Sequence, residues 1–277
     1  MARRSWYGNM IIILVLLLLG AFLALPLVYA VTYSLKPLEE VFVFPPALWV
    51  KRPTLWNYKS LIYLSSNMGV PLTRYLFNSV FISAAVTAGH IIVASMAAYP
   101  LAKYKMKLSW LFNVVVGALL FNTTIMALPQ YLILSRLRVI NTYFVYILPI
   151  LPMPIGLFLM KQFMERLPFA MIEAAKIDGA GEMGLLFRIV MPVVKPAWLT
   201  LCVFVFAAAW NQQPMSMVFD ENLKLINMVI IQIASGGLAR AGAVMAAGVI
   251  IMIPPVAVFM VTQNSVIQTM QASGIKE

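Results

Sequence analysis

The side chains that could do chemistry are few in this chain, and their positions argue against most enzymes. The only histidine, His90, and the only cysteine, Cys202, both lie inside long apolar runs. No G-x-x-x-x-G-K-[ST] sequence is present, so we expect this chain to bind no ATP through such a loop. No H-E-x-x-H motif or Cys/His cluster indicates a metal. We therefore expect no catalytic residue, no metal and no cofactor, and a membrane enzyme is disfavoured.

The acidic residues also fail to suggest a carrier that works alone. All nine of them lie outside the long apolar runs. A carrier driven by protons or ions normally needs a titratable group within the membrane. His90 could relay protons, but a neutral, hydrogen-bonded packing residue is the interpretation that we favour. A secondary carrier is therefore kept only as an alternative function, and the energy for any transport is expected to come from outside this chain.

Uncharged polar side chains within the apolar runs are better candidates for contact with a solute. Unpaired amides in hydrocarbon are costly, so such groups need a wet or paired environment. An indole beside amides could stack on a flat apolar face of a solute while the amides bond its polar groups. Alternatively, these residues cap a helix end at the membrane interface or hold helices together. The candidates for a translocation pathway are Trp210, Asn211, Gln212, Asn78 and Asn122.

Composition identifies the elements that position these groups as membrane helices. The chain has 277 residues, of which 62% are hydrophobic and only 10% charged, too few to cover a soluble globule of this size. Its net charge of +11 is scattered between apolar runs, so no basic face for nucleic acid forms. We expect an all-α integral membrane protein in one transmembrane domain, residues 1–277. Its six predicted spans cover residues 10–33, 77–101, 110–134, 143–163, 197–217 and 241–263.

Several details of these spans can be predicted. The run 10–33 is too long for the apolar part of a cleaved signal peptide, which is the alternative. Pro149, Pro152 and Pro154 should kink or break the fourth span. The apolar piece 225–233 is expected to fold partly back toward the membrane.

Charge distribution predicts the orientation. Basic residues are almost equally frequent on the two sides, but three of them, Lys103, Lys105 and Lys107, crowd into one very short loop. Cytoplasmic loops are enriched in lysine and arginine, so we place this loop and both termini in the cytoplasm.

One charged, glycine-interrupted stretch, Glu173 to Pro192 (EAAKIDGAGEMGLLFRIVMP), stands apart from the spans. Glu173 to Lys176 are good helix formers, and Asp178-Gly179 supplies a turn in which glycine can adopt positive φ. A helical pattern resumes at Glu182. The sequence predicts two short helices joined by a glycine corner. Such a pair lies at the membrane surface or docks onto another protein.

The spacing of this stretch resembles the cytoplasmic EAA loop in the membrane subunits of ABC importers. The matching residues are Glu173-Ala174-Ala175, Asp178-Gly179-Ala180, and Ile189 with Pro192. Weaker matches to the carbohydrate (maltose-type) permeases are SLKP at Ser34, NS at Asn78, AAYPLAKY at Ala97, NTY at Asn141, WN at Trp210 and GIKE at Gly274. The likeness is greatest to the smaller membrane subunit of maltose transporters, although Gln212 stands where that pattern often has an acidic residue.

The resemblance implies a type I ABC importer permease fold with residues 164–192 as a cytoplasmic coupling loop. Its coupling residues would be Glu173, Ala174, Ala175, Asp178, Gly179 and Ala180. The implied function is binding-protein-dependent import of a sugar or oligosaccharide through the bacterial or archaeal cell membrane. Another organic solute, such as a polyol or glycerol phosphate, is the alternative. The implied partners are a second permease, an ABC ATPase dimer that binds the ATP, an extracytoplasmic sugar-binding protein and membrane lipid.

Overall fold

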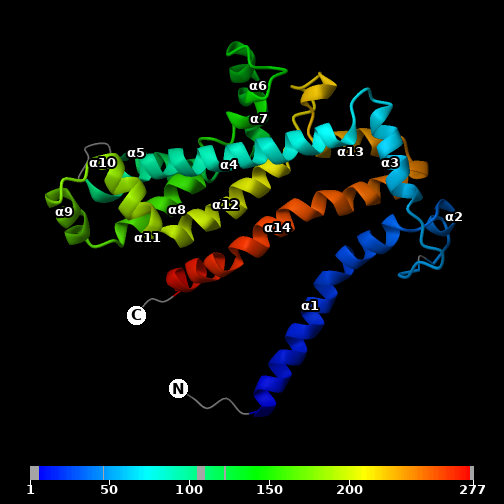
Figure 1. The fold of residues 1–277 in the computed structure, drawn as a ribbon, viewed down its shortest axis with the longest axis horizontal. Coiled ribbons are helices and arrows are strands. Elements are labelled where there is room, and N and C mark those ends of the chain that lie inside the picture. The colour runs from blue at the N-terminus through cyan, green and yellow to red at the C-terminus, as the bar shows by residue number, and fades with distance from the viewer. Residues whose placement is uncertain (1–5, 46, 105–109, 122, 275–277) are drawn as a thin grey trace. The chain divides into compact units, whose positions relative to one another are not determined.

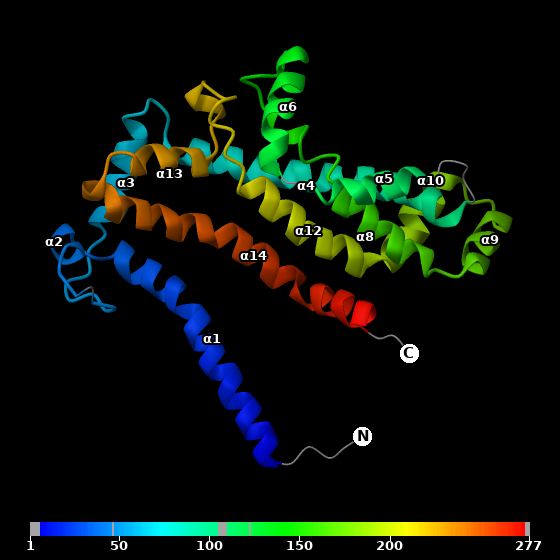
Figure 2. The same ribbon diagram turned by 180° about the vertical axis from the view of Figure 1, so that it is seen from behind.

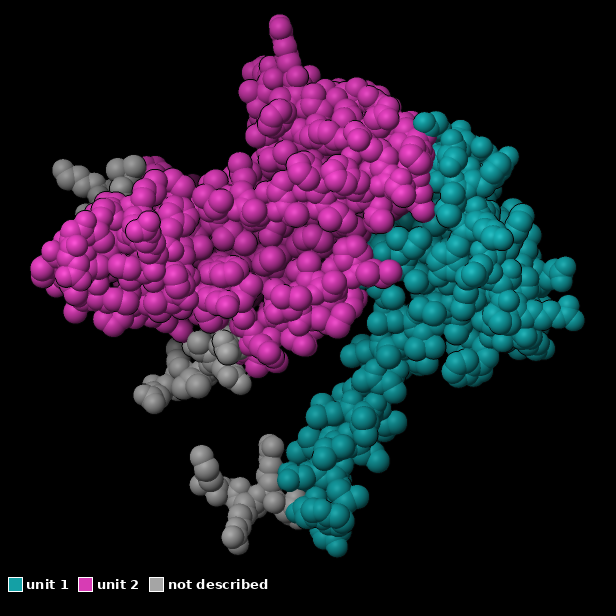
Figure 3. Space-filling view, in the orientation of Figure 1, with its two compact units in different colours: residues 1–69, 230–252 teal, residues 70–229, 253–277 magenta. Residues whose placement is uncertain are grey.

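The computed structural model describes residues 6–45, 47–104, 110–121 and 123–274, and the regular structure within them is helical. The chain divides into two compact units, which Figure 3 distinguishes by colour. Unit 1 comprises residues 1–69 and 230–252, and unit 2 comprises residues 70–229 and 253–277.

Unit 1 contains the N-terminal helix. Its helices are α1 (Trp6–Ser34), α2 (Leu38–Val41), α3 (Trp56–Ser66) and the 3-10 helix η3 (Leu238–Arg240). Two further helices, α13 (Ile226–Ala234) and α14 (Ala241–Gly274), have residues in both units. α1 is apolar on all sides and contains no charged residue, which is typical of a membrane span.

Unit 2 contains the longest run of helices. They are α4 (Leu72–Lys103), α5 (Trp110–Ala118), α6 (Thr123–Arg136), α7 (Phe144–Ile147), α8 (Pro154–Glu165), α9 (Phe169–Ile177), α10 (Glu182–Gly184), the π-helix η1 (Leu185–Val190), α11 (Met191–Val193), α12 (Lys195–Trp210) and the 3-10 helix η2 (Glu221–Leu223). α4 packs against α8 and α12, and the three run side by side in Figures 1 and 2.

In α4 the polar and apolar side chains are distributed in the opposite way to those of a helix in a soluble protein. Its small polar side chains face the protein and are buried, while large apolar ones such as Phe77 and Phe81 are exposed. Hydroxyl groups on the buried face bond to carbonyls of their own helix: Thr87 Oγ1 donates to the Ser83 carbonyl at 2.6 Å. Such a face lets helices approach closely in lipid, so α4 can serve as the central helix of a membrane bundle.

The described residues contain three helices long and apolar enough to cross a membrane: Trp6–Ser34, Leu72–Lys103 and Leu238–Ile267. They correspond to the first, second and sixth predicted spans. The pair Glu182–Val193 and Lys195–Trp210 passes the same test but is bent by 83° at the break between them. The protein is therefore a multi-pass membrane protein.

The other predicted spans are interrupted. The fourth, residues 143–163, is broken between Ile147 and Pro154, as its prolines predict. The third, residues 110–134, is not one helix: α5 ends at Ala118, and turn bonds over residues 116–121 follow. Gly117, a poor helix former, lies one residue before this end. In the fifth, α12 ends at Trp210, earlier than predicted.

Candidate functional site

The predicted helix, corner and helix of residues 164–192 are present. α9 ends at Ile177, and Gly179 has a φ of +83°. The N–H of Gly179 donates to the carbonyl of Lys176, and the N–H of Ala180 donates to that of Ala175, both at 3.0 Å. These two bonds form a Schellman motif, which satisfies the last carbonyls of a helix and requires a left-handed residue. The corner therefore depends on glycine at position 179.

A cluster of polar side chains fastens this corner to the end of α4. The Glu182 carboxylate accepts hydrogen bonds from the Tyr104 hydroxyl at 2.8 and 2.9 Å, and from the Tyr99 hydroxyl at 3.4 Å. Lys176 Nζ lies 2.8 Å from Glu182 Oε1 and also donates to the Tyr104 hydroxyl at 2.8 Å. The hydrogen bond to Glu182 and, to a smaller extent, the hydrogen bond to Tyr104 raise the pKa of Lys176, so this lysine stays charged. Also at the C-terminus of α4, Lys103 donates to the carbonyl of Leu167 at 2.6 Å.

The predicted coupling residues divide into two groups. Ala175 and Ala180 are half-buried and pack on a core beneath the corner. The outer residues are exposed; they are Glu173, Ala174, Asp178 and Gly179, with the apolar Ile177 beside them at 86% exposure. The corner thus presents carboxylates and an isoleucine outward, a combination suited to contact with another protein.

The pathway candidates on α12 lie in three different environments. Trp210 is 1% exposed and stacks on Phe206 with ring centroids 5.7 Å apart. Asn211 forms the helix C-cap and is exposed, and its Nδ2 donates to the Ala207 carbonyl at 2.9 Å. Gln212 donates to the carbonyl of Tyr146 at 3.1 Å. Their adjacency in sequence therefore does not create one surface.

Gln212 lines a cavity of about 470 Å³ in unit 2. α6, the segment after α7, α12 and the segment after α12 supply the lining residues: Ala127, Gln130, Pro149, Ile150, Met153, Ala208, Gln212, Gln213, Pro214, Ser216 and Met217. Its polar side chains are three amides and one hydroxyl, and no lining residue is charged. Amides and hydroxyls both donate and accept hydrogen bonds, so this cavity suits an uncharged polar solute.

Asn78 lies in a separate polar cluster at the start of α4. Its Nδ2 donates to the carbonyls of Asn222 and Lys224 at 2.7 and 3.2 Å, and its Oδ1 accepts from the Tyr143 hydroxyl at 3.0 Å. The two Nδ2 bonds thus hold the loop after α12, and the Oδ1 bond ties α4 to Tyr143 at the start of α7. The remaining pathway candidate, Asn122, lies outside the described residues.

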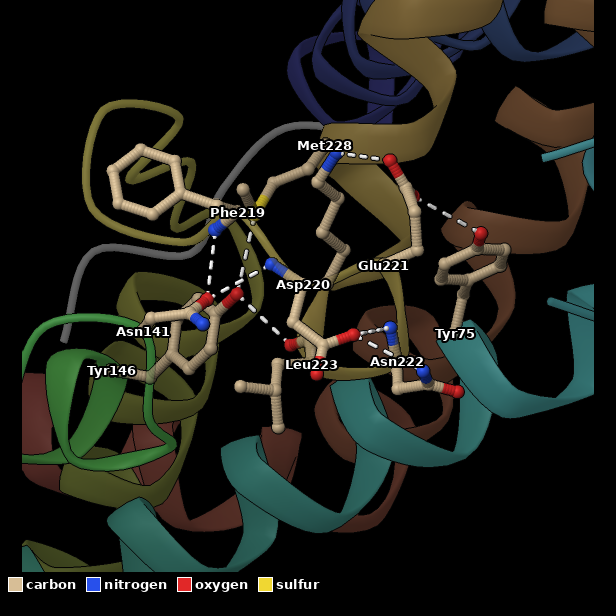
Figure 4. Close-up of polar contacts among 10 residues, drawn as sticks. Tyr75, Asn141, Tyr146, Phe219, Asp220, Glu221, Asn222, Leu223 and Met228 are labelled. Carbon is tan, nitrogen blue, oxygen red and sulfur yellow. Dashed lines mark hydrogen bonds and ion pairs between the residues drawn. The ribbon is translucent and has the colours of Figure 1, made fainter. Parts of the chain in front are cut away.

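The loop of residues 219–224, shown in Figure 4, is a feature that sequence reasoning missed. Asn141, at a φ of +60°, accepts hydrogen bonds from the N–H groups of Phe219 and Asp220 at 2.9 Å each. The Tyr75 hydroxyl donates to Glu221 at 3.2 Å. Hydrogen bonds from the backbone and side chain of Asn222 lower the pKa of Asp220. The run Asp-Glu-Asn itself was a signal, since such residues favour turns.

His90 and Gly156 mark a very close approach of α4 and α8. His90 is 1% exposed and its Nδ1 lies 3.0 Å from the carbonyl of Leu151, in the break between α7 and α8. A Cβ added at Gly156 would lie 2.0 Å from His90 Nε2. His90 is thus a hydrogen-bonded packing residue that supports the broken span.

Relatives of the chain cover nearly its whole length. It is 29% identical to the sulfoquinovosyl glycerol transport system permease protein SmoH of Agrobacterium fabrum, over 95% of this chain and 91% of that protein. It is 31% identical to the sn-glycerol-3-phosphate transport system permease protein UgpE of Yersinia enterocolitica, over 90% of this chain and 92% of that protein. A shorter match, 33% identical over 69% of this chain and 63% of the relative, is to the protein LplC of Bacillus subtilis. No family model matches the sequence.

The fold has a solved counterpart. A crystal structure of a bacterial ABC transporter that imports the acidic polysaccharide alginate contains a chain that matches with a TM-score of 0.76. The match covers 95% of this chain and 99% of that one at 19% identity. Because the identity to UgpE extends over almost all of both chains and the fold agrees, the protein belongs to the carbohydrate-type permeases of ABC importers.

Proposed function

We propose that this permease forms half of a pathway that admits a sugar or oligosaccharide into the cell, powered by a separate ATPase. The 31% identity to UgpE, which extends over 90% of this chain, carries the permease part of the proposal. The expected partners are a second permease, an ABC ATPase dimer and an extracytoplasmic sugar-binding protein, with membrane lipid around them. This chain supplies the path and the coupling contact, and the ATPase supplies the chemistry.

The cavity beside Gln212 favours a neutral sugar over a phosphate ester. A phosphate group is normally held by arginine, lysine or a helix N-terminus. The cavity instead offers Gln130, Gln212, Gln213 and Ser216. These groups suit hydroxyls, whereas glycerol phosphate, the alternative solute, would meet no cation among the lining residues.

The proposed arrangement in the membrane has six spans and two cytoplasmic termini. The three long helices account for the first, second and sixth spans. The broken elements α5 with α6, α7 with α8, and the bent pair ending in α12 are proposed to complete the other three. Lys103 and the α9–α10 corner lie together at one end of α4, and loop 219–224 lies at its other end. This separation supports a cytoplasmic coupling loop and an external loop 219–224.

We expect Gln212 to affect transport more strongly than its neighbour Asn211. Gln212→Ala removes a side-chain amide from the cavity, whereas Asn211→Ala removes an exposed amide that bonds only its own helix. A lost hydrogen bond of about 1 kcal/mol reduces uptake about fivefold. Uptake of radiolabelled candidate sugars into proteoliposomes that hold the whole complex measures the effect. Equal loss in both variants, or none, would remove Gln212 from the pathway.

The orientation is tested by labelling single cysteines in a Cys202→Ala background. We expect Glu40→Cys to react with a membrane-impermeant maleimide added to intact cells and Glu182→Cys to react only after the membrane is opened. Both residues lie outside the three long spans, which makes them a matched pair. Labelling of both sites from outside would contradict the six-span arrangement.

A further inference from the structure

The chain that follows α1 folds into a closed loop whose base is tied to the end of that helix. The N–H of Thr54 donates to the carbonyl of Leu35 at 2.9 Å, one residue beyond the end of α1. Asn57 Nδ2 donates to the carbonyl of Ser34 at 2.8 Å. Residues 37–54, which include α2 in Figure 1, therefore begin and end next to the C-terminal end of α1.

A buried lysine fixes the shape of this loop. Lys36 is 2% exposed, and its Nζ donates to the carbonyl of Ala47. The same Nζ lies 5.7 and 5.5 Å from the ring centroids of Tyr29 and Tyr33, in the last turns of α1. A cation held between aromatic rings and a carbonyl joins the loop to the helix.

The acidic side chain of Glu40 is used inside the loop. Its two oxygens accept the backbone N–H groups of Lys51 and Arg52 at 3.1 and 2.9 Å. The side chains of Lys51 and Arg52 remain exposed. The internal bonds thus define the backbone of the loop. The two basic side chains lie on the segment that returns toward α1.

The outer surface of this structured loop is strongly apolar. Phe44 is 92% exposed and Trp49 is 74% exposed. Phe42, Val43 and Leu48 are each more than half exposed. Internal bonds hold the backbone, so these side chains are displayed outward by a fixed structure. Large exposed aromatic groups gathered in one short loop indicate a surface that something apolar covers.

The length of α1 indicates what covers it. At 1.5 Å per residue, the 29 residues of α1 extend about 44 Å. This exceeds the ~30 Å hydrocarbon core and equals the thickness with headgroups. The end of α1, and with it the tied base of the loop, therefore lies at the level of the lipid headgroups. Tryptophan and phenylalanine beside lysine and arginine are suited to that region.

We propose that residues 37–54 form a membrane-anchoring loop whose aromatic side chains, Phe44 and Trp49 foremost, insert into the phospholipid headgroup region at the end of α1. A soluble protein that docks on this loop would leave the aromatic groups in water whenever it departed. The bilayer covers them at all times. The proposal requires α1 to span the membrane and does not depend on the solute or on the ATPase.

Depth-dependent fluorescence quenching tests this anchoring. Single cysteines at Phe44, Trp49 and, as the control on the same loop, the exposed Glu39 are made in the Cys202→Ala background and labelled with bimane. The labelled complex is placed in phosphatidylcholine nanodiscs containing lipids with a shallow doxyl quencher. We expect the Phe44→Cys and Trp49→Cys probes to be quenched at least twofold more than the Glu39→Cys probe, and to be shielded from aqueous iodide.

Equal iodide quenching at all three sites, without quenching by doxyl lipid, would overturn the proposal. Shielding of Phe44→Cys and Trp49→Cys that appears only after addition of the sugar-loaded binding protein would also overturn it, and would assign the loop to protein docking. The Phe44→Cys variant retains Trp49. Quenching of its probe by doxyl lipid therefore reports the depth of the loop in a protein that still has the indole. Failure of sugar uptake by the same complex in proteoliposomes would contradict the proposed function and leave the quenching result unchanged.

Discussion

Replacing Gly156 with alanine is expected to lower the free energy of unfolding by about 1–3 kcal/mol, the usual cost of forcing an extra group into a packed core. The new Cβ would lie 2.0 Å from His90 Nε2 and 3.0 Å from the Ala94 Cβ. Neither neighbour moves easily, because His90 also bonds the Leu151 carbonyl. We therefore expect α4 and α8 to separate slightly and the permease to assemble poorly. Thermal unfolding of the purified complex, followed by size-exclusion chromatography, measures the effect.

Gly248→Ala is the matched control, because Gly248 also lies within a helix but has no atom within 4 Å of its added Cβ. That change should be neutral or slightly stabilising, since alanine favours helix more than glycine does. The double variant His90→Ala with Gly156→Ala should be less destabilised than the sum of the single changes. Simple additivity, or an unchanged melting temperature for Gly156→Ala, would show that the close approach is not a determinant of stability.

The second large effect is expected at the corner of the proposed coupling loop. Gly179→Val places a β-branched residue at a φ of +83°, where side chains are disfavoured by about 1–2 kcal/mol or more. The carbonyls of Lys176 and Ala175 would then lose their Schellman partners or the corner would change shape. We expect sugar uptake to fall about 5–30-fold, the factor that corresponds to such a free energy, while the ATPase hydrolyses ATP without transport.

Gly181→Val provides the control for this experiment. Gly181 lies two residues away and has a φ of −72° and a ψ of 163°, which valine adopts readily. A Cβ there also meets no atom within 4 Å. Uptake and ATP hydrolysis are measured on both reconstituted complexes. If Gly181→Val and Gly179→Val behave alike, the corner conformation has no part in coupling.

α1, α4 and α14 cover three of the predicted spans as continuous helices. Each of them contains proline, which did not end the helix: Pro26 in α1, Pro100 in α4, and Pro254 with Pro255 in α14. The sequence also predicted the break before Pro154, because proline lacks a backbone donor. It did not predict that α5 ends at Ala118, since hydropathy alone gives no sign of a turn inside an apolar segment.

For the candidate site, local patterns were predictable and long-range contacts were not. The positive φ of Gly179 follows from the Asp-Gly pair and its helical flanks. By contrast, Glu182 meets Tyr99 and Tyr104 across about eighty residues of sequence, a contact that no local pattern specifies. The three neighbours Trp210, Asn211 and Gln212 separate because α12 ends at Trp210, and of the three only Gln212 lines the cavity.

The continuous helix α4 gives the protein a mechanical property. Its Tyr75 contacts Glu221, and its Tyr99 contacts Glu182, with 24 residues, or about 36 Å of helix, between the two tyrosines. A continuous helix of this length is stiff, and a tyrosine near each of its ends donates a hydrogen bond to an acidic side chain. A tilt of α4 imposed through Glu182 would therefore also displace Tyr75 from Glu221, so α4 links the position of the α9–α10 corner to that of loop 219–224.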